Sequence, residues 1–163
     1  MKAIYWDMDG TIADLYGYEN WLEILQAEDV TPYADCKPLV NMNELNSILC
    51  EFVKLGVTIG VISWGAMNCS KEYTRETKRA KVAWCEKYLT CVTEYHVVKY
   101  GTPKHLVAKE KDSVLIDDNT DGFIYMVSSA AITGTQKSFD DANQEYFRRI
   151  NAMNLRNPRM IGF

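Results

Sequence analysis

The feature that most constrains the fold is an alternation of short apolar runs with longer amphipathic segments. Lys2–Trp6, Val57–Ser63 and Val114–Asp117 are short and rich in branched and aromatic residues, which is typical of buried strands. Val92–Val98 is a weaker run of the same kind. Strands that alternate with helices predict an α/β fold with a mostly parallel sheet. The runs lack strict polar alternation, so we expect a three-layer, Rossmann-like arrangement with both sheet faces covered.

Two segments have the spacing of long helices. In the first, Asn43 is a possible N-cap, Gly56 a plausible stop, and the apolar stripe is Leu45, Ile48, Leu49 and Phe52. The second covers 70–89, with an inward stripe of Tyr73, Thr77, Ala80, Trp84 and Tyr88. Shorter helices are expected within 14–28, at 104–110, after Gly122 and at 140–153, with a further strand near 130–133 and a loop around Pro32 and Pro38.

Length and composition limit the class of protein. A chain of 163 residues favours one domain, 1–163, with a core of its own. Its net charge of −4 argues against non-specific binding of nucleic acid or anionic lipid. The chain shows no signal-peptide pattern, no apolar run near the ~18 residues of a membrane span, and no CxxC pair among its five cysteines. We therefore expect a reduced, cytoplasmic protein without a disulfide framework.

Polar residues follow three of the expected strands. Asp7 and Asp9 come after the first, Ser63 ends the second, and Asp117 and Asp118 end the last. Ligands of parallel α/β sheets gather beyond these carboxyl ends. Four carboxylates close together require a cation, and a set of oxygen ligands favours Mg²⁺. With Ser63 and a lysine such as Lys104 to bind phosphate, the pattern indicates phosphoryl transfer.

These residues carry a resemblance to a known family. The sequence resembles the haloacid dehalogenase (HAD) phosphatase superfamily, whose first motif, DxDGT, is matched by Asp7–Thr11. Its second motif, a serine or threonine ending an apolar strand, is matched by Ser63, and its third, a lysine opening a helix, by Lys104. Its fourth, an acidic pair after a strand, is matched by Asp117–Asp118. The four motifs occur in the family's order.

The resemblance implies a Mg²⁺-dependent phosphomonoester hydrolase that works through an aspartyl-phosphate intermediate. Asp7 would be the nucleophile and Asp9 the general acid and base. The metal ligands would be the Asp7 carboxylate, the backbone carbonyl of Asp9, Asp117 and Asp118, and either Asp117 or Asp118 could be the direct ligand of the last pair.

The resemblance also implies a set of phosphate contacts. Ser63 and Lys104 would hold the phosphoryl oxygens, with Thr11 supporting the loop and contributing to phosphate binding. Two other lysines compete with Lys104 for this role, Lys99 directly after a strand and Lys81 in the second long helix.

In this family the substrate is selected by an inserted cap, for which only residues 14–42 leave room. That segment holds one helix and a loop, so we expect a minimal cap. The start of the chain is similar to the 5′-nucleotidase (deoxyribonucleotidase) branch and to compact bacterial and bacteriophage HAD proteins, which implies a small phosphorylated metabolite or nucleotide as substrate. Two alternatives stay open: a phosphatase for polynucleotide ends or phosphoprotein, and a non-catalytic, receiver-like phospho-accepting module.

Overall fold

The structure is a computed structural model that describes residues 1–109 and 112–118. The helices expected after Gly122 and at 140–153, and the strand expected near 130–133, lie outside the described residues.

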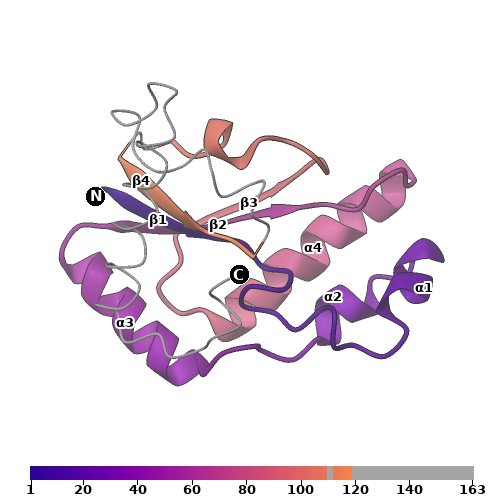
Figure 1. The fold of residues 1–163 in the computed structure, drawn as a ribbon, viewed down its shortest axis with the longest axis horizontal. Helices are drawn as coiled ribbons and strands as arrows, with labels where there is room; N and C mark the ends of the chain where they lie inside the picture. The colour runs from indigo at the N-terminus through magenta and orange to yellow at the C-terminus, as the bar shows by residue number, and fades with distance from the viewer. Residues whose placement is uncertain (110–111, 119–163) are drawn as a thin grey trace, which may run out of the picture.

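The described part of the chain is built on a four-stranded sheet. Its strands are β1 (Ala3–Trp6), β2 (Thr58–Trp64), β3 (Glu94–Val98) and β4 (Ser113–Ile116). All pairings are parallel, and the strand order is β3-β2-β1-β4 (Figure 1). The predicted α/β fold with a parallel sheet is therefore confirmed.

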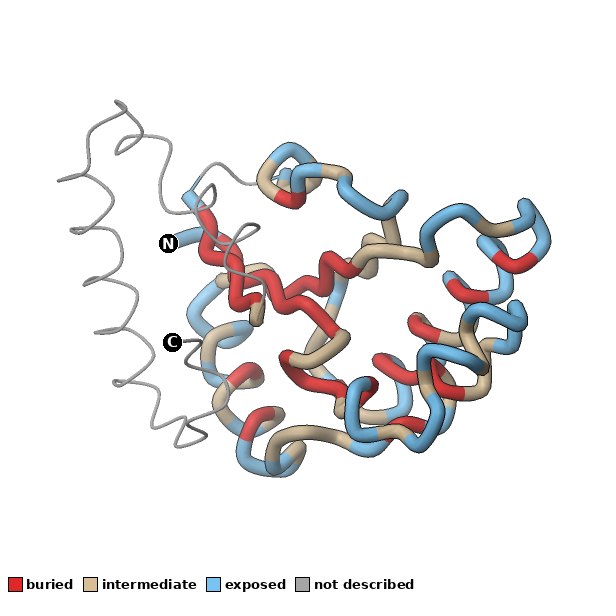
Figure 2. The backbone as a smooth tube through the Cα atoms, turned by 45° about the vertical axis from the view of Figure 1, so that its right-hand side comes forward, coloured by how far each residue is buried: buried red, intermediate tan, exposed pale blue. Residues whose placement is uncertain are grey.

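The strand order places β1 in the interior of the sheet. On one side Ala3 pairs with Thr58 of β2, and on the other it pairs with Ser113 of β4. The chain moves outward from β1 to β3 and then returns to the far side of β1, so the order reverses between β1 and β4. Such a reversal opens a crevice at the carboxyl ends of the strands. Figure 2 shows β1 and β4 as buried along their whole length.

Two long helices pack on one face of the sheet, as Figure 1 shows: α3 (Met42–Lys54) and α4 (Lys71–Tyr88). The N-cap of α3 is Asn41, not the expected Asn43, because the Asn41 side chain accepts hydrogen bonds from the backbone N–H groups of Asn43 and Glu44. Ser70 caps α4 in the same way. The α3 residues Leu45 and Leu49 and the α4 residues Trp84 and Cys85 enter the main core.

The segment expected to form a minimal cap contains two short helices instead of one, α1 (Trp21–Gln26) and α2 (Thr31–Asp35). Pro32 lies in the first turn of α2, where its missing N–H costs no helical hydrogen bond. Between the two helices, Glu28 accepts hydrogen bonds from the backbone N–H and hydroxyl of Ser70, both at 2.7 Å. This contact fastens the segment to the first turn of α4.

One disulfide was not expected. Cys50 in α3 and Cys91 before β3 are bonded, with their Cα atoms 5.6 Å apart. The odd number of cysteines gave no sign of this pair, because residues 41 positions apart meet only through the fold. Cys36, Cys69 and Cys85 are free thiols.

The connection from β3 to β4 contains a short 3-10 helix, η1 (Lys104–Leu106), at the start of the predicted helix. Among the described residues, no helix combines the length and apolar character needed to span a lipid bilayer.

Candidate functional site

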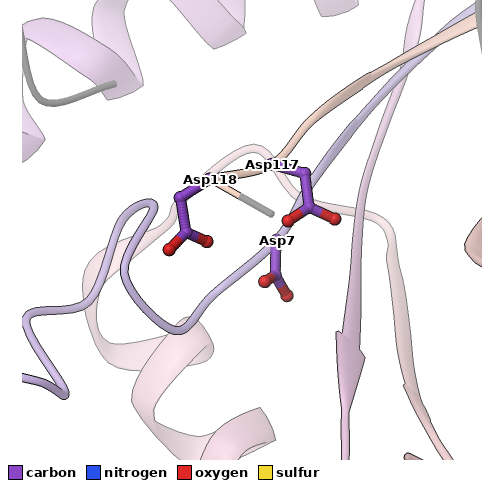
Figure 3. Close-up of side chains that lie close together, drawn as sticks. All are labelled: Asp7, Asp117 and Asp118. Atoms are coloured by element: carbon purple, nitrogen blue, oxygen red, sulfur yellow. The ribbon is translucent and has the colours of Figure 1, made fainter. Parts of the chain in front are cut away.

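Three carboxylates meet at the carboxyl ends of the two neighbouring strands β1 and β4. Asp7 follows β1, and Asp117 and Asp118 follow β4 (Figure 3). The backbone N–H of Asp7 continues the ladder by donating to the carbonyl of Ile116 at 2.8 Å, which fixes the two strand ends against each other. One carboxylate oxygen from each acid lies within 4.8 Å of the others, so this cluster has the geometry to hold a cation.

Lys104 supplies positive charge to this cluster. From the start of η1, its ammonium lies 2.6 Å from Asp117 Oδ2 and 3.0 Å from Asp7 Oδ2, with the Trp64 ring centroid at 4.8 Å. The side chain is 1% exposed. Burial lowers the pKa of Lys104, but the charges of Asp7 and Asp117 outweigh it and raise the pKa above its usual value. The neighbouring acids therefore favour the charged form of Lys104.

Asp9 does not join the three clustered carboxylates. Its Oδ2 is bonded to the ammonium of Lys81, a 1%-exposed side chain from α4. Lys81 also donates to Ser63 Oγ at 3.1 Å and to the carbonyl of Trp64 at 2.7 Å. The site thus contains two acid–lysine units side by side, Asp7 and Asp117 with Lys104, and Asp9 with Lys81.

Thr11 and Gly10 shape the loop between these units. The Thr11 hydroxyl donates to Asp118 Oδ1 at 3.2 Å and accepts from the backbone N–H of Asp118 at 3.0 Å. Gly10 has a positive φ of 76°, and a Cβ there would lie 2.3 Å from Asp118 Oδ2 and 2.5 Å from the Tyr16 ring. A side chain at position 10 would therefore strain the backbone and displace Asp118 and Tyr16, and Thr11 acts in this structure mainly on Asp118.

Burial changes the acidity of two of these carboxyl groups. Loss of solvent raises the pKa of Asp9, and this effect exceeds the opposing influence of Lys81. Burial, and then the charge of Asp7, raises the pKa of Asp118. Both groups hold their protons more tightly than a free aspartate does.

A cavity of about 570 Å³ opens beside the carboxylates, and Asp7, Asp9 and Asp118 are part of its lining. Two pairs of rings also line it: Tyr16 with Trp21, and Trp64 with Tyr100, each with centroids 5.1 Å apart. The segment α1–α2 contributes one side of the cavity, and the loop after β2 contributes the other. Among the described residues, Asp7 Oδ1 and Asp9 Oδ1 are buried without a hydrogen-bond partner.

The structure therefore brings together Asp7, Asp117, Asp118, Thr11 and Lys104, and it places Asp9 and Ser63 beside them on Lys81. Of the competing lysines, Lys99 is exposed at the end of β3. Lys81 belongs to the site, although the sequence favoured Lys104 over it as the phosphate-binding lysine. A signal was present: Lys81 lies four residues after Thr77 and eight after Tyr73, on the inward stripe of α4.

The comparisons with known proteins point to another family. The chain is similar to tryptophan synthase alpha chains: it is 76% identical over 82 residues to that of Phocaeicola vulgatus, which covers 49% of this chain and 31% of the relative. For Parabacteroides distasonis the figures are 69% over 49 residues, with 30% of this chain and 19% of the relative covered. The chain is 67% identical over 48 residues to the alpha chain of Bacteroides fragilis, which covers 29% of this chain and 18% of the relative.

The chain spans less than a third of the length of these curated relatives, and about half of it or more lies outside each aligned segment. No family model matches the chain, and no solved structure does.

These relatives contradict the identification as a HAD phosphatase. The predicted hydrolase activity is therefore wrong, together with its aspartyl-phosphate intermediate and its nucleotide or metabolite substrate. The Mg²⁺ cofactor that was inferred with this activity is wrong for the same reason. The two alternative functions, a phosphatase for polynucleotide ends or phosphoprotein and a receiver-like module, receive no support from these relatives either. The physical reason is that motif spacing fixes where the carboxylates lie but not which bond they act on, because one strand-end cluster serves many reactions. The roles of the individual site residues stay predictions.

Proposed function

We propose that the cavity at the carboxyl edge of the sheet binds a small phosphorylated molecule that carries a planar ring. The observation that carries this proposal is the pair of buried ammonium groups, Lys81 and Lys104, which contact Asp9 and Asp7, two acids that line a cavity with aromatic walls. A lysine is a point charge suited to phosphate, and ring pairs offer flat surfaces for stacking. Lys104, Ser63 and Thr11 are the proposed phosphate contacts.

The ring of the ligand has a defined place in this proposal. Trp64 lies against Lys104 and also lines the cavity, so the walls that would stack on a ring begin directly beside the proposed phosphate contacts. Tyr16 and Trp21 face the same space from the segment that covers it. A ligand with a phosphate at one end and a ring at the other fits this arrangement of charge and aromatic surface.

Asp7 and Asp9 are the proposed catalytic pair. Each has one buried oxygen without a hydrogen-bond partner among the described residues, and both line the cavity. Asp9, whose pKa burial raises, is the proposed general acid. Asp7, which contacts the Lys104 ammonium, would take the complementary role of base. Two carboxyl groups in different environments are a common source of paired acid and base chemistry.

The relatives favour one reaction for this site. Since they are tryptophan synthase alpha chains, we propose that the chain acts in tryptophan synthesis on indole-glycerol phosphate, together with a beta chain. This compound has both the phosphate and the planar ring that the cavity suits. The chain spans less than a third of the length of those relatives. The reaction is therefore proposed separately from the binding of a phosphorylated ring compound, and it has a test of its own.

Calorimetric titration tests the binding proposal. We expect indole-glycerol phosphate to bind more tightly than either glycerol 3-phosphate or indole, because only the complete compound reaches both Lys104 and the rings. Lys104→Met should weaken the binding of every phosphorylated compound, whereas the exposed Lys99→Met should not. If none of the phosphorylated compounds binds the wild-type chain, the proposed function is wrong.

A separate assay tests the reaction. Tryptophan formation from indole-glycerol phosphate is measured with a tryptophan synthase beta chain, with and without this chain. Binding without any gain in tryptophan formation would contradict the tryptophan synthase role and leave the binding proposal standing.

A further inference from the structure

We propose that Lys81 is a positioning residue that fixes the orientation of Asp9, which lines the ligand cavity, and of the neighbouring Ser63, a role that deepens the proposed function and rests on it. Three acceptors surround its ammonium group: Asp9 Oδ2, Ser63 Oγ at 3.1 Å and the carbonyl of Trp64 at 2.7 Å. An ammonium group has three N–H donors, so each finds one acceptor.

The setting of Lys81 shows that this arrangement is specific. The side chain is 1% exposed, and the Tyr33 ring of α2 lies 4.4 Å from its ammonium nitrogen. Burying a lysine is costly unless it is paired and fully hydrogen-bonded. The other lysines of α4, Lys71, Lys78 and Lys87, are exposed. The burial of Lys81 is therefore not that of a lysine on a solvated helix face. It is explained by the three acceptors that Lys81 holds at the ends of two strands.

Two of the three contacts of Lys81 fix the orientation of a polar group on its partner. Because Oδ2 of Asp9 is bonded to Lys81, its other oxygen, Oδ1, is the one without a hydrogen-bond partner among the described residues. Because Ser63 Oγ accepts from Lys81, its hydroxyl proton is directed away from the ammonium. Lys81 thus holds Asp9, which lines the cavity, in one orientation and sets the direction of the Ser63 hydroxyl, while Lys81 itself does not line the cavity.

The experiment compares Lys81→Met with Lys78→Met, the matched control from the exposed face of α4. Three-bond NMR couplings report the χ1 angles of Asp9 and Ser63 without any ligand. We expect one rotamer for each in the wild type and in the control, and averaged couplings in Lys81→Met. Unchanged couplings in a folded Lys81→Met variant would overturn the inference, whatever the chain binds.

Ligand affinity provides the second readout. In a double-mutant cycle, Lys81→Met and Asp9→Asn should each weaken the binding of indole-glycerol phosphate about tenfold or more, as expected for a hydrogen bond to a charged group. The loss in the double variant should be smaller than the sum of the two separate losses, because part of the effect of Lys81 passes through Asp9. Additive losses would overturn the inference, and an absence of wild-type binding would instead refute the proposed function.

If Lys81→Met alone does not fold, the double variant carries the test, because it removes both buried charges together. Averaged Ser63 couplings in that variant would support the role of Lys81, and a fixed Ser63 rotamer would overturn it.

Discussion

The ammonium of Lys104 lies 2.6 Å from Oδ2 of Asp117, between the ends of β1 and β4. Removing a single partner from a buried ion pair leaves the other charge uncompensated. We therefore expect Lys104→Met to lower the free energy of unfolding by about 3–5 kcal/mol in urea titrations. The exposed Lys99→Met should change it by less than about 0.5 kcal/mol.

The same variant tests the carboxylate cluster as a cation site. Without Lys104, the carboxylates of Asp7, Asp117 and Asp118 keep no lysine between them. Added Ca²⁺ should then raise the Tm of Lys104→Met more than that of the wild type, because the ion stabilises only the folded cluster. Equal shifts in the two proteins would show that the cluster does not attract a cation.

Thr11 ties the loop after β1 to the end of β4. Its hydroxyl exchanges two hydrogen bonds with Asp118, one of them with the backbone N–H. Thr11→Val keeps the shape but leaves both groups unsatisfied, so we expect a loss of about 1–3 kcal/mol of stability. Thr11→Ser retains the hydroxyl and should recover most of this loss. A valine variant as stable as the wild type would show that water replaces these bonds at no cost.

The disulfide between Cys50 and Cys91 restrains the unfolded chain. Its partners are 41 positions apart, and closing a loop of this size stabilises a protein by about 2–4 kcal/mol in the chain-entropy view. Cys50→Ser should therefore shift the urea midpoint downward and remove its dependence on reductant. Cys69→Ser, which alters a free thiol, should keep that dependence. A wild-type midpoint that is indifferent to reductant would contradict the bond.

Glu94 on β3 should make stability depend on pH. Its carboxylate accepts hydrogen bonds from His96 at 3.0 Å and Lys109 at 2.9 Å, and the bond from His96 is the main reason that its pKa lies below 4.5. The folded chain thus binds this proton more weakly than the unfolded chain does. The stabilisation is present above pH 4.5 and is lost as the pH falls through the lower, folded-state value.

Thermal unfolding between pH 3 and pH 6 checks this dependence. Glu94→Gln should flatten the acid side of the Tm profile, whereas the exposed Glu72→Gln on α4 should leave it unchanged. If the Glu94 and Glu72 variants have the same profile, the contact with His96 contributes nothing to stability.

Much of the fold was predictable because buried strands leave a local pattern. The runs at 2–6 and 57–63 became β1 and β2 to within a residue or two, and the stripe of 70–89 became α4. The helix at Thr31–Asp35 was missed because Pro32 was interpreted as a breaker, although a proline fits the first turn. The Cys50–Cys91 bond was missed because it depends on tertiary contact alone.

The site was predictable only in part. Strand ends converge in a parallel sheet, which is why Asp7 and Asp117 were expected together and lie together. The same rule gives no information about side chains that arrive from a helix, so Lys81 was not favoured over Lys104, although both are buried there. The chemistry was least predictable, because a cluster of acids and lysines does not specify the bond it acts on.

The interior position of β1 has a consequence for synthesis on the ribosome. One edge of this strand can pair with β2 early, but its other edge must wait for Ser113–Ile116. Until then Tyr5 and Trp6, both buried in the finished fold, lie beside a bare row of backbone donors and acceptors. A nascent chain held at this stage is therefore at its most vulnerable to edge-to-edge aggregation, and the arrival of β4 ends that exposure.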